Sequence, residues 1–329
     1  MQIKRVGIIR GGTGNQHASS VRKGGNIISH IFENLSDKYK TVDIFIDKNG
    51  NWHANGLPII PVDLVRKVDI VWDISEHPSS SVTLDDFSIP NVGKRHFLKV
   101  LENNNDMLRK YMKEIGVQMP RSMVLPVYQE DFSAEGGSAS GGEGSINLYA
   151  IKKAKEVFEK FSAPWVVKSF TPDSNMGIHL AKTFGELSEA IEYGVNHNKS
   201  ILIEEFIAGK PSTVHSISGF REKDIYIFPL IDISIGEKAP TPKGVGIPTE
   251  SVGKKINDII KILHNHLGIK YYLKSDFVLS PKRGFFLTNI ESLPDLRKGS
   301  HFEQSCQYVG AEIHHVLEHI LEKVLNKRK

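Results

Sequence analysis

The amino-acid sequence of 329 residues predicts an α/β lobe at the N-terminal end followed by two α+β lobes. The first observation is an apolar run, residues 6–9, that leads through a glycine-rich turn at 10–15 into a helical pattern, as in a β-loop-α unit. The second is that further β-rich runs follow at once, as an open sheet requires. The third is length, because a chain of this size suits two or three domains that share a cleft.

In the first lobe, residues 6–9 read as a buried parallel strand, and a helix is expected from about residue 18 to residue 35. Residues 41–46 and 68–74 are rich in β-branched and aromatic side chains and predict further strands. A shorter strand is expected at 89–92. These elements complete an open α/β sheet.

In the middle region, residues 94–116 have helical spacing of apolar side chains, with Gly116 and Pro120 as stop signals. Residues 133–145 are nearly free of large apolar side chains and predict a flexible loop. A helix is expected at 150–161, followed by a strand at 165–168.

In the last region, residues 201–206 predict a strand, while 225–235 and 277–287 read as antiparallel meander strands. Residues 256–267 and 311–325 have the spacing of amphipathic helices.

Composition limits the class of protein. Hydrophobic residues make up 40% and charged residues 24%, which is close to the average for globular proteins. The net charge of +4 is spread along the chain, so no basic stripe predicts binding to nucleic acid. No apolar run reaches the length of a membrane span. Cys306 is the only cysteine, which favours a reducing compartment, and we expect a cytoplasmic protein.

Acidic and amide side chains gather on two runs near the C-terminal end. Asp276 follows Lys274 on one strand-like run, and Asn289 and Glu291 share a face of the next. Mg²⁺ prefers oxygen ligands such as these, so the pattern predicts a metal site. The alternative is that the carboxylates are solvated at strand ends, as isolated acidic residues usually are.

Five stretches occur in the order and separation typical of one enzyme group. They are residues 11–13 with Ser20 and Gly24, residues 165–168, residues 201–209, residues 275–277, and residues 293–294 with Ser300. Together they resemble the ATP-grasp superfamily, and within it the D-alanine–D-alanine ligases, from residue 6 to residue 325. The resemblance implies a Rossmann-like pre-ATP-grasp domain at 1–94, a central ATP-grasp lobe at 95–200 and a C-terminal lobe with the metal site at 201–329.

The resemblance also implies roles for individual residues. Lys168 would contact the nucleotide phosphates, with Ser174 in the loop that follows it. The adenine would be received by the strand that contains Glu204, Glu205, Phe206 and Ile207. Lys238 would lie near the transferred phosphate and act in catalysis.

The implied reaction activates a carboxylate by phosphoryl transfer from ATP and forms an amide when an amine attacks the acyl phosphate. Asp276, Asn289 and Glu291 would hold one or two Mg²⁺ ions, with Mn²⁺ as an alternative, and Lys274 would stabilise the oxyanion. Gln16 and Ser300 would bind small amino-acid or peptide substrates. The family also suggests a homodimer formed through the first lobe.

Several residues depart from the family pattern. The metal strand of such ligases reads Glu-x-Asn, whereas this chain has Asn289 and Glu291 in exchanged positions. Gln16 replaces a glutamate that holds the substrate ammonium, and Asn105 and Asn175 stand where phosphate contacts are expected. Three readings follow: a ligase with altered substrates, a nucleotide-binding or interaction module without catalysis, and a true D-alanine–D-alanine ligase with unusual site chemistry.

Overall fold

The computed structural model describes residues 2–14, 16–75, 77–93, 96–128, 143–170, 176–197, 200–233 and 250–326. The chain divides into two compact units. Unit 1 comprises Met1–Glu102, Lys210–Phe277 and Asn289–Lys329, and unit 2 comprises Asn103–Gly209 and Val278–Thr288. The finer division into three domains stays a prediction.

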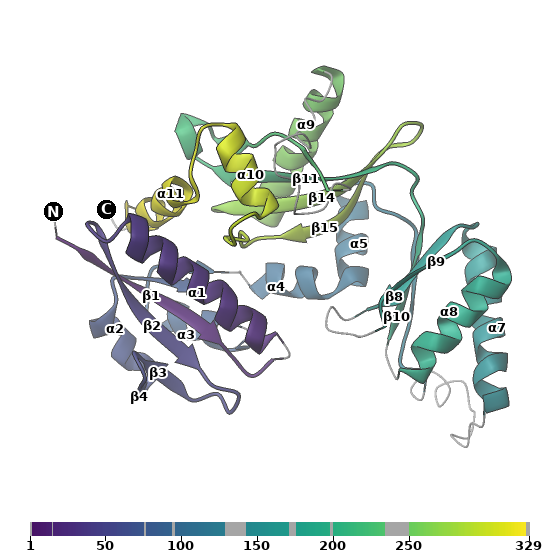
Figure 1. The fold of residues 1–329 in the computed structure, drawn as a ribbon, viewed down its shortest axis with the longest axis horizontal. Helices are drawn as coiled ribbons and strands as arrows, with labels where there is room; N and C mark the ends of the chain where they lie inside the picture. The colour runs from purple at the N-terminus through teal and green to yellow at the C-terminus, as the bar shows by residue number, and fades with distance from the viewer. Residues whose placement is uncertain are drawn as a thin grey trace. The chain divides into compact units, whose positions relative to one another are not determined.

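The N-terminal part of unit 1 is a six-stranded sheet with the order β4-β3-β2-β1-β5-β6 (Figure 1). Its strands are β1 (Lys4–Gly11), β2 (Tyr39–Ile46), β3 (Trp52–Ala54), β4 (Leu57–Ile59), β5 (Ile70–Asp73) and β6 (Asn91–Gly93). Strands β2, β1, β5 and β6 are parallel, which confirms the predicted α/β sheet. The antiparallel β3 and β4 were not predicted.

The helical segments of this part are α1 (His17–Asn34), η1 (Pro61–Asp63), α2 (Leu64–Lys67), α3 (Ser80–Asp86) and α4 (His96–Asn103). The end of β1 explains one glycine of the first motif. Gly11 has a φ of +88°, and a Cβ there would lie 2.2 Å from the carbonyl oxygen of Ile46. Only glycine fits this turn without a shift of the backbone.

The C-terminal part of unit 1 is built on a second sheet with the order β12-β11-β14-β15, with β13 paired to β11. These strands are β11 (Lys210–Ser218), β12 (Ile225–Ile227), β13 (Ile231–Asp232), β14 (Tyr272–Ser280) and β15 (Gly284–Glu291). The remaining elements are η2 (Phe220–Glu222), α9 (Glu250–Leu267), α10 (His301–Tyr308) and α11 (Ile313–Asn326). The segments predicted as meander strands, 225–235 and 277–287, are each interrupted. The described part of the first contains β12 and β13, which pair antiparallel with β11, and the second contains the end of β14 and the start of β15.

One hydrophobic core joins the two parts of unit 1. Val6 and Ile8 of β1 and Ile31 of α1 belong to the same buried cluster as Leu317 and Ile320 of α11. The opposite face of the first sheet has its own cluster. The last helix is therefore part of the core that covers the first strand.

Unit 2 is a four-stranded antiparallel sheet with the order β7-β10-β8-β9 and two helices on one face (Figure 1). Its elements are α5 (Asn105–Glu114), β7 (Ser122–Leu125), α7 (Glu143–Lys160), β8 (Trp165–Ser169), β9 (Ile178–Ala181), α8 (Phe184–Asn196) and β10 (Ile201–Glu205). Trp165, Val167 and Ile203 lie in the core with residues of both helices. Strand alternation places Lys168 and Glu204 on the other face.

The helix predicted at 94–116 is divided into α4 and α5. Asn104 has an extended backbone, and its side chain accepts a hydrogen bond of 3.0 Å from the Met107 N–H. Asparagine at this position caps a new helix better than it continues an old one. None of the helices in the described ranges is long and apolar enough to cross a membrane.

Candidate functional site

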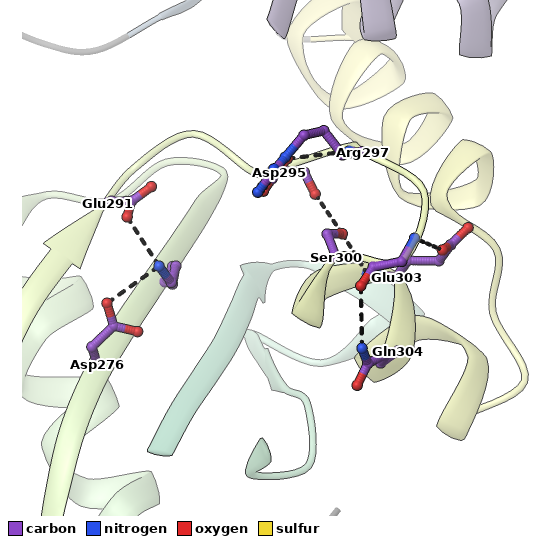
Figure 2. A network of polar contacts seen from close by, with 9 residues as sticks. Asp276, Glu291, Asp295, Arg297, Ser300, Glu303 and Gln304 are labelled. Carbon is purple, nitrogen blue, oxygen red and sulfur yellow. Dashed lines mark hydrogen bonds and ion pairs between the residues drawn. The ribbon is translucent and has the colours of Figure 1, made fainter. Parts of the chain in front are cut away.

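The predicted metal ligands lie together on the second sheet of unit 1. Lys274 and Asp276 occupy one face of β14, and Asn289 and Glu291 occupy one face of its neighbour β15. The Lys274 Nζ lies 3.2 Å from Asp276 Oδ2 and 3.0 Å from Glu291 Oε1. In Figure 2 the two carboxylates extend toward each other from these strands.

Electrostatics keep Lys274 charged. Burial alone would lower the pKa of Lys274, but the carboxylates of Asp276 and Glu291 outweigh it and raise the pKa above its usual value. One ammonium thus neutralises part of a two-carboxylate site.

The donor set suits a hard cation. Two carboxylates and one amide contain oxygen atoms of the kind that Mg²⁺ prefers, but Asn289 turns its amide nitrogen toward the carboxylates and donates at 3.4 Å to Asp276 Oδ2 and Glu291 Oε1. In the parts of the chain that are described, no cluster of three or more His, Cys, Asp or Glu residues forms a metal site. Metal binding would therefore depend on Asn289 as a third ligand, and it stays a prediction.

Ser300, the predicted substrate residue, is the N-cap of α10. Its hydroxyl accepts from the Glu303 N–H at 3.2 Å and donates to the Asp295 carbonyl oxygen at 2.9 Å. The Glu303 carboxylate accepts from the Gly299 N–H, and Asp295 forms an ion pair of 2.6 Å with Arg297 (Figure 2). The hydroxyl is thus used by the fold, and a role in substrate binding stays a prediction.

The sequence did not reveal that Glu102 supports this region. Its carboxylate accepts hydrogen bonds from the Ser292 N–H at 2.8 Å and the Ser292 hydroxyl at 2.5 Å. Ser292 directly follows Glu291, so Glu102 fixes the chain where β15 ends. No local pattern links two residues that are 190 positions apart.

In unit 2, the predicted nucleotide residues Lys168 and Glu204 form an ion pair of 2.5 Å. The other Glu204 carboxylate oxygen pairs with Arg109, whose side chain is only 10% exposed. Burial lowers the pKa of Arg109, and attraction to Glu204 opposes that shift. Arg109 lies one turn beyond Asn105 on α5 and was not predicted as a partner of Glu204.

Glu205 is held by two arginines. Its carboxylate lies 3.1 Å from Arg121 and 2.5 Å from Arg283. Burial alone would raise the pKa of Glu205, but the hydrogen bonds from both arginines lower it to about 2. Glu205 therefore has a structural role in unit 2.

The two residues after Glu205 differ in exposure. The Phe206 N–H donates to the Pro164 carbonyl oxygen at 3.0 Å, and its ring is exposed. Ile207 is buried. One of the backbone donors predicted for adenine thus already has a protein acceptor.

The structure says less about the remaining predicted residues. Gln16 directly precedes α1, and its carbonyl oxygen accepts from the Ser20 N–H at 2.9 Å. Ser174, Asn175 and Lys238 lie outside the described residues. Their roles stay predictions.

Comparison with known proteins agrees with the resemblance. The family model for the C-terminus of D-ala D-ala ligase matches residues 145–239. The D-alanine–D-alanine ligases of Oceanobacillus iheyensis and Desulforamulus reducens are each 21% identical to the chain. The first matches 99% of this chain and 96% of its own length. The second matches 98% of this chain and 99% of its own length.

Solved structures share the fold. The VanG D-Ala:D-Ser ligase from Enterococcus faecalis has a TM-score of 0.72 at 18% identity, covering 98% of this chain and 100% of that one. The D-alanine–D-alanine ligase from Bacillus anthracis complexed with ATP has a TM-score of 0.68 at 18% identity, covering 99% of this chain and 98% of that one. With the motifs and the strand order described above, these matches show that the chain has the fold of the D-alanine–D-alanine ligases and resembles them along nearly its full length.

Proposed function

We propose that the chain is an ATP-dependent carboxylate–amine ligase with substrates other than two D-alanines. The observation that carries this proposal is the convergence of Lys274, Asp276, Asn289 and Glu291 in a chain that matches such ligases along nearly its full length. Gln16 supports altered substrates, because a neutral amide cannot supply the counter-charge that an ammonium group needs.

The proposed chemistry has two steps. A carboxylate oxygen of the first substrate attacks the γ-phosphorus of ATP, and ADP leaves. The amine of the second substrate then attacks the acyl carbon, loses a proton and expels phosphate, so that an amide forms. Mg²⁺ held by Asp276, Asn289 and Glu291 would neutralise phosphoryl charge.

The chain's own residues have separate tasks in this proposal. Lys274 offers a charged group to the developing oxyanion. Lys168 offers an ammonium to the nucleotide phosphates, and Glu204 to Ile207 would receive the adenine. A homodimer formed through the first lobe and a cytoplasmic location belong to the same proposal.

A phosphate-release assay tests the function. Purified protein is incubated with MgATP and pairs drawn from D- and L-amino acids and dipeptides, and release above the ATP-only rate is expected with at least one pair. The double variant Asp276→Ala/Glu291→Ala should lose this release. Asp258→Ala, which removes an exposed carboxylate of α9, should retain it.

A second candidate is a nucleotide-binding or interaction module that has lost catalysis. It is favoured by the internal partners of the predicted nucleotide residues, since Glu204 already pairs with Lys168 and Arg109. Measurable ATP binding without phosphate release for any substrate pair would support this candidate and reject the ligase.

A further inference from the structure

A groove of about 660 Å³ lies on unit 2. It is lined by α5, by the segment that leads from α5 into β7, and by the C-terminal end of α7. None of the residues predicted to bind nucleotide, substrate or metal lines it. The groove adjoins the predicted nucleotide residues, because Arg109 and Arg121 of its lining pair with Glu204 and Glu205.

The lining is strongly basic. It contains five cationic side chains and a single carboxylate, that of Asp106; the cations are Arg109, Lys110, Lys113, Arg121 and Lys160. Three of the cations have carboxylate partners: Lys110 pairs with Asp106 at 2.7 Å, and Arg109 and Arg121 pair with carboxylates of β10.

Two cations remain to attract a ligand. Lys113 and Lys160 are exposed and form no ion pair with any residue in the described ranges. The Lys160 Nζ contacts the Met123 sulfur at 3.6 Å. The groove therefore keeps an excess of positive charge that carboxylates of unit 2 do not cancel.

Arg109 gives a second, independent indication of a ligand. Its side chain is 10% exposed, and its Nε is buried with no acceptor among the described residues. A buried donor without an acceptor is costly, so the protein gains when an anionic oxygen reaches it.

The shape of the groove selects the size and kind of ligand. Its volume lies in the range of about 300–1,000 Å³ that is usual for small-molecule sites. Val117, Pro120 and Phe161 add buried apolar surface to its lining. Guanidinium and ammonium groups bind phosphate oxygens, and the apolar residues beside them can contact a compact organic group attached to the phosphates.

We propose that this groove binds a small organic anion that carries two or more phosphate groups. Lys113 and Lys160 attract the ligand, and Arg109 and Arg121 provide directed hydrogen bonds. The proposed ligand takes no part in the ligase reaction proposed above, although Arg109 also pairs with Glu204 of the predicted nucleotide site.

Calorimetric titration with inorganic triphosphate tests the site. Binding is expected, and its affinity should fall between about 50 and 200 mM salt because the contacts are ionic. Lys113→Gln/Lys160→Gln should weaken binding roughly tenfold or more, since two charge-assisted contacts are lost. Lys254→Gln/Lys255→Gln on α9 removes two exposed charges elsewhere and should leave the affinity unchanged.

Lys168→Met separates the groove from the predicted nucleotide site. Triphosphate binding that survives this substitution and fails in the Lys113/Lys160 variant supports the proposal. Three results would overturn it. They are binding that fails in Lys168→Met but survives in Lys113→Gln/Lys160→Gln, an equal loss in Lys113→Gln/Lys160→Gln and in Lys254→Gln/Lys255→Gln, or no binding at all. Binding of a single-stranded oligonucleotide that depends on Lys113 and Lys160, without binding of triphosphate, would also overturn it, because the groove would then serve a macromolecule.

Discussion

Lys274 places one ammonium between two carboxylates that a divalent cation would otherwise share. Replacing it with methionine leaves Asp276 and Glu291 facing each other without a counter-charge, so a cation should bind there more tightly. We expect the Mg²⁺ affinity of Lys274→Met to rise roughly tenfold in titrations without nucleotide, because one competing charge is removed.

Lys282→Met is the matched control, because Lys282 is exposed in the turn between β14 and β15. It should leave Mg²⁺ affinity unchanged. Equal affinity in wild type and Lys274→Met would mean that the cation binds away from these carboxylates.

Replacing Lys168 tests whether it belongs to the predicted nucleotide site. Lys168→Met removes a phosphate partner, and Glu204 would keep only Arg109. Affinity for a fluorescent ATP analogue should fall roughly tenfold, as expected for one lost charge-assisted hydrogen bond. The exposed Lys182 on the same unit serves as the control position, and unaltered affinity in Lys168→Met would remove Lys168 from the site.

Strand β10 is anchored at its last residue. Ionised Glu205 bonds to Arg121 and Arg283, and its folded pKa of about 2 lies below the ordinary value of 4.5. A lowered acid pKa contributes stability that is complete above about 4.5 and is lost as the pH falls toward about 2. The Glu205→Gln variant should therefore be less stable at pH 7 and less sensitive to acid.

The expected loss is about 1–2 kcal/mol at neutral pH, because both arginines are half exposed and solvent screens the pairs. Urea unfolding at several pH values measures it. Glu189→Gln, an exposed change on α8, should leave the pH profile as in the wild type. Parallel profiles for wild type and Glu205→Gln would contradict the anchoring role.

Helix α10 begins with a cap that is also a predicted substrate contact. Ser300→Ala removes the bond from the Glu303 N–H and the bond to the Asp295 carbonyl oxygen. Stability should fall by about 1–2 kcal/mol, as for other lost caps. Thermal unfolding measures the change, with Thr183→Ala at the start of α8 as a cap that has no proposed function. An unchanged stability in Ser300→Ala would show that its hydroxyl is available for other partners.

Elements with strong local signals could be predicted, and short or offset ones could not. The β-loop-α start and the strands Ile201–Glu205 and Trp165–Ser169 follow from apolar runs and glycine turns. The β3–β4 hairpin was missed although Asn55-Gly56, both with positive φ, is a typical hairpin turn. Its strands have only three residues each, too few for a clear period.

At the scale of the whole molecule, the site depends on contacts between distant segments. The predicted metal ligands were found because they lie close together in sequence on neighbouring strands. Arg109 and Glu204 are 95 positions apart, and Glu102 and Ser292 are 190 positions apart, so no local period connects them. Such pairs form only when the fold brings separate segments together.

Cys306 provides a probe of unit 1 as a whole. It is fully buried in the cluster that joins the two sheets, and burial raises the pKa of its thiol to about 12. Both effects suppress the reactive thiolate, so the thiol should react with a disulfide reagent only when unit 1 opens. The rate should rise with urea in step with loss of helical signal.

A reference chain with Cys306→Ala and Lys48→Cys carries its thiol on an exposed turn instead. It should react within the dead time of mixing by hand and without dependence on urea. Rapid reaction of Cys306 in the wild type would show that the core around α10 opens without global unfolding.

The shared core of unit 1 also sets an order for folding during synthesis. Val6, Ile8 and Ile31 leave the ribosome about 300 residues before Leu317 and Ile320, which cover them. The main segment of unit 2, Asn103–Gly209, is complete well before then. We therefore expect unit 2 to fold first. The first sheet keeps an apolar face exposed to chaperones until α11 has been synthesised. Ribosome-bound chains halted before α11 should accordingly bind a chaperone through the N-terminal sheet, and release after the addition of α11 would be the confirming observation.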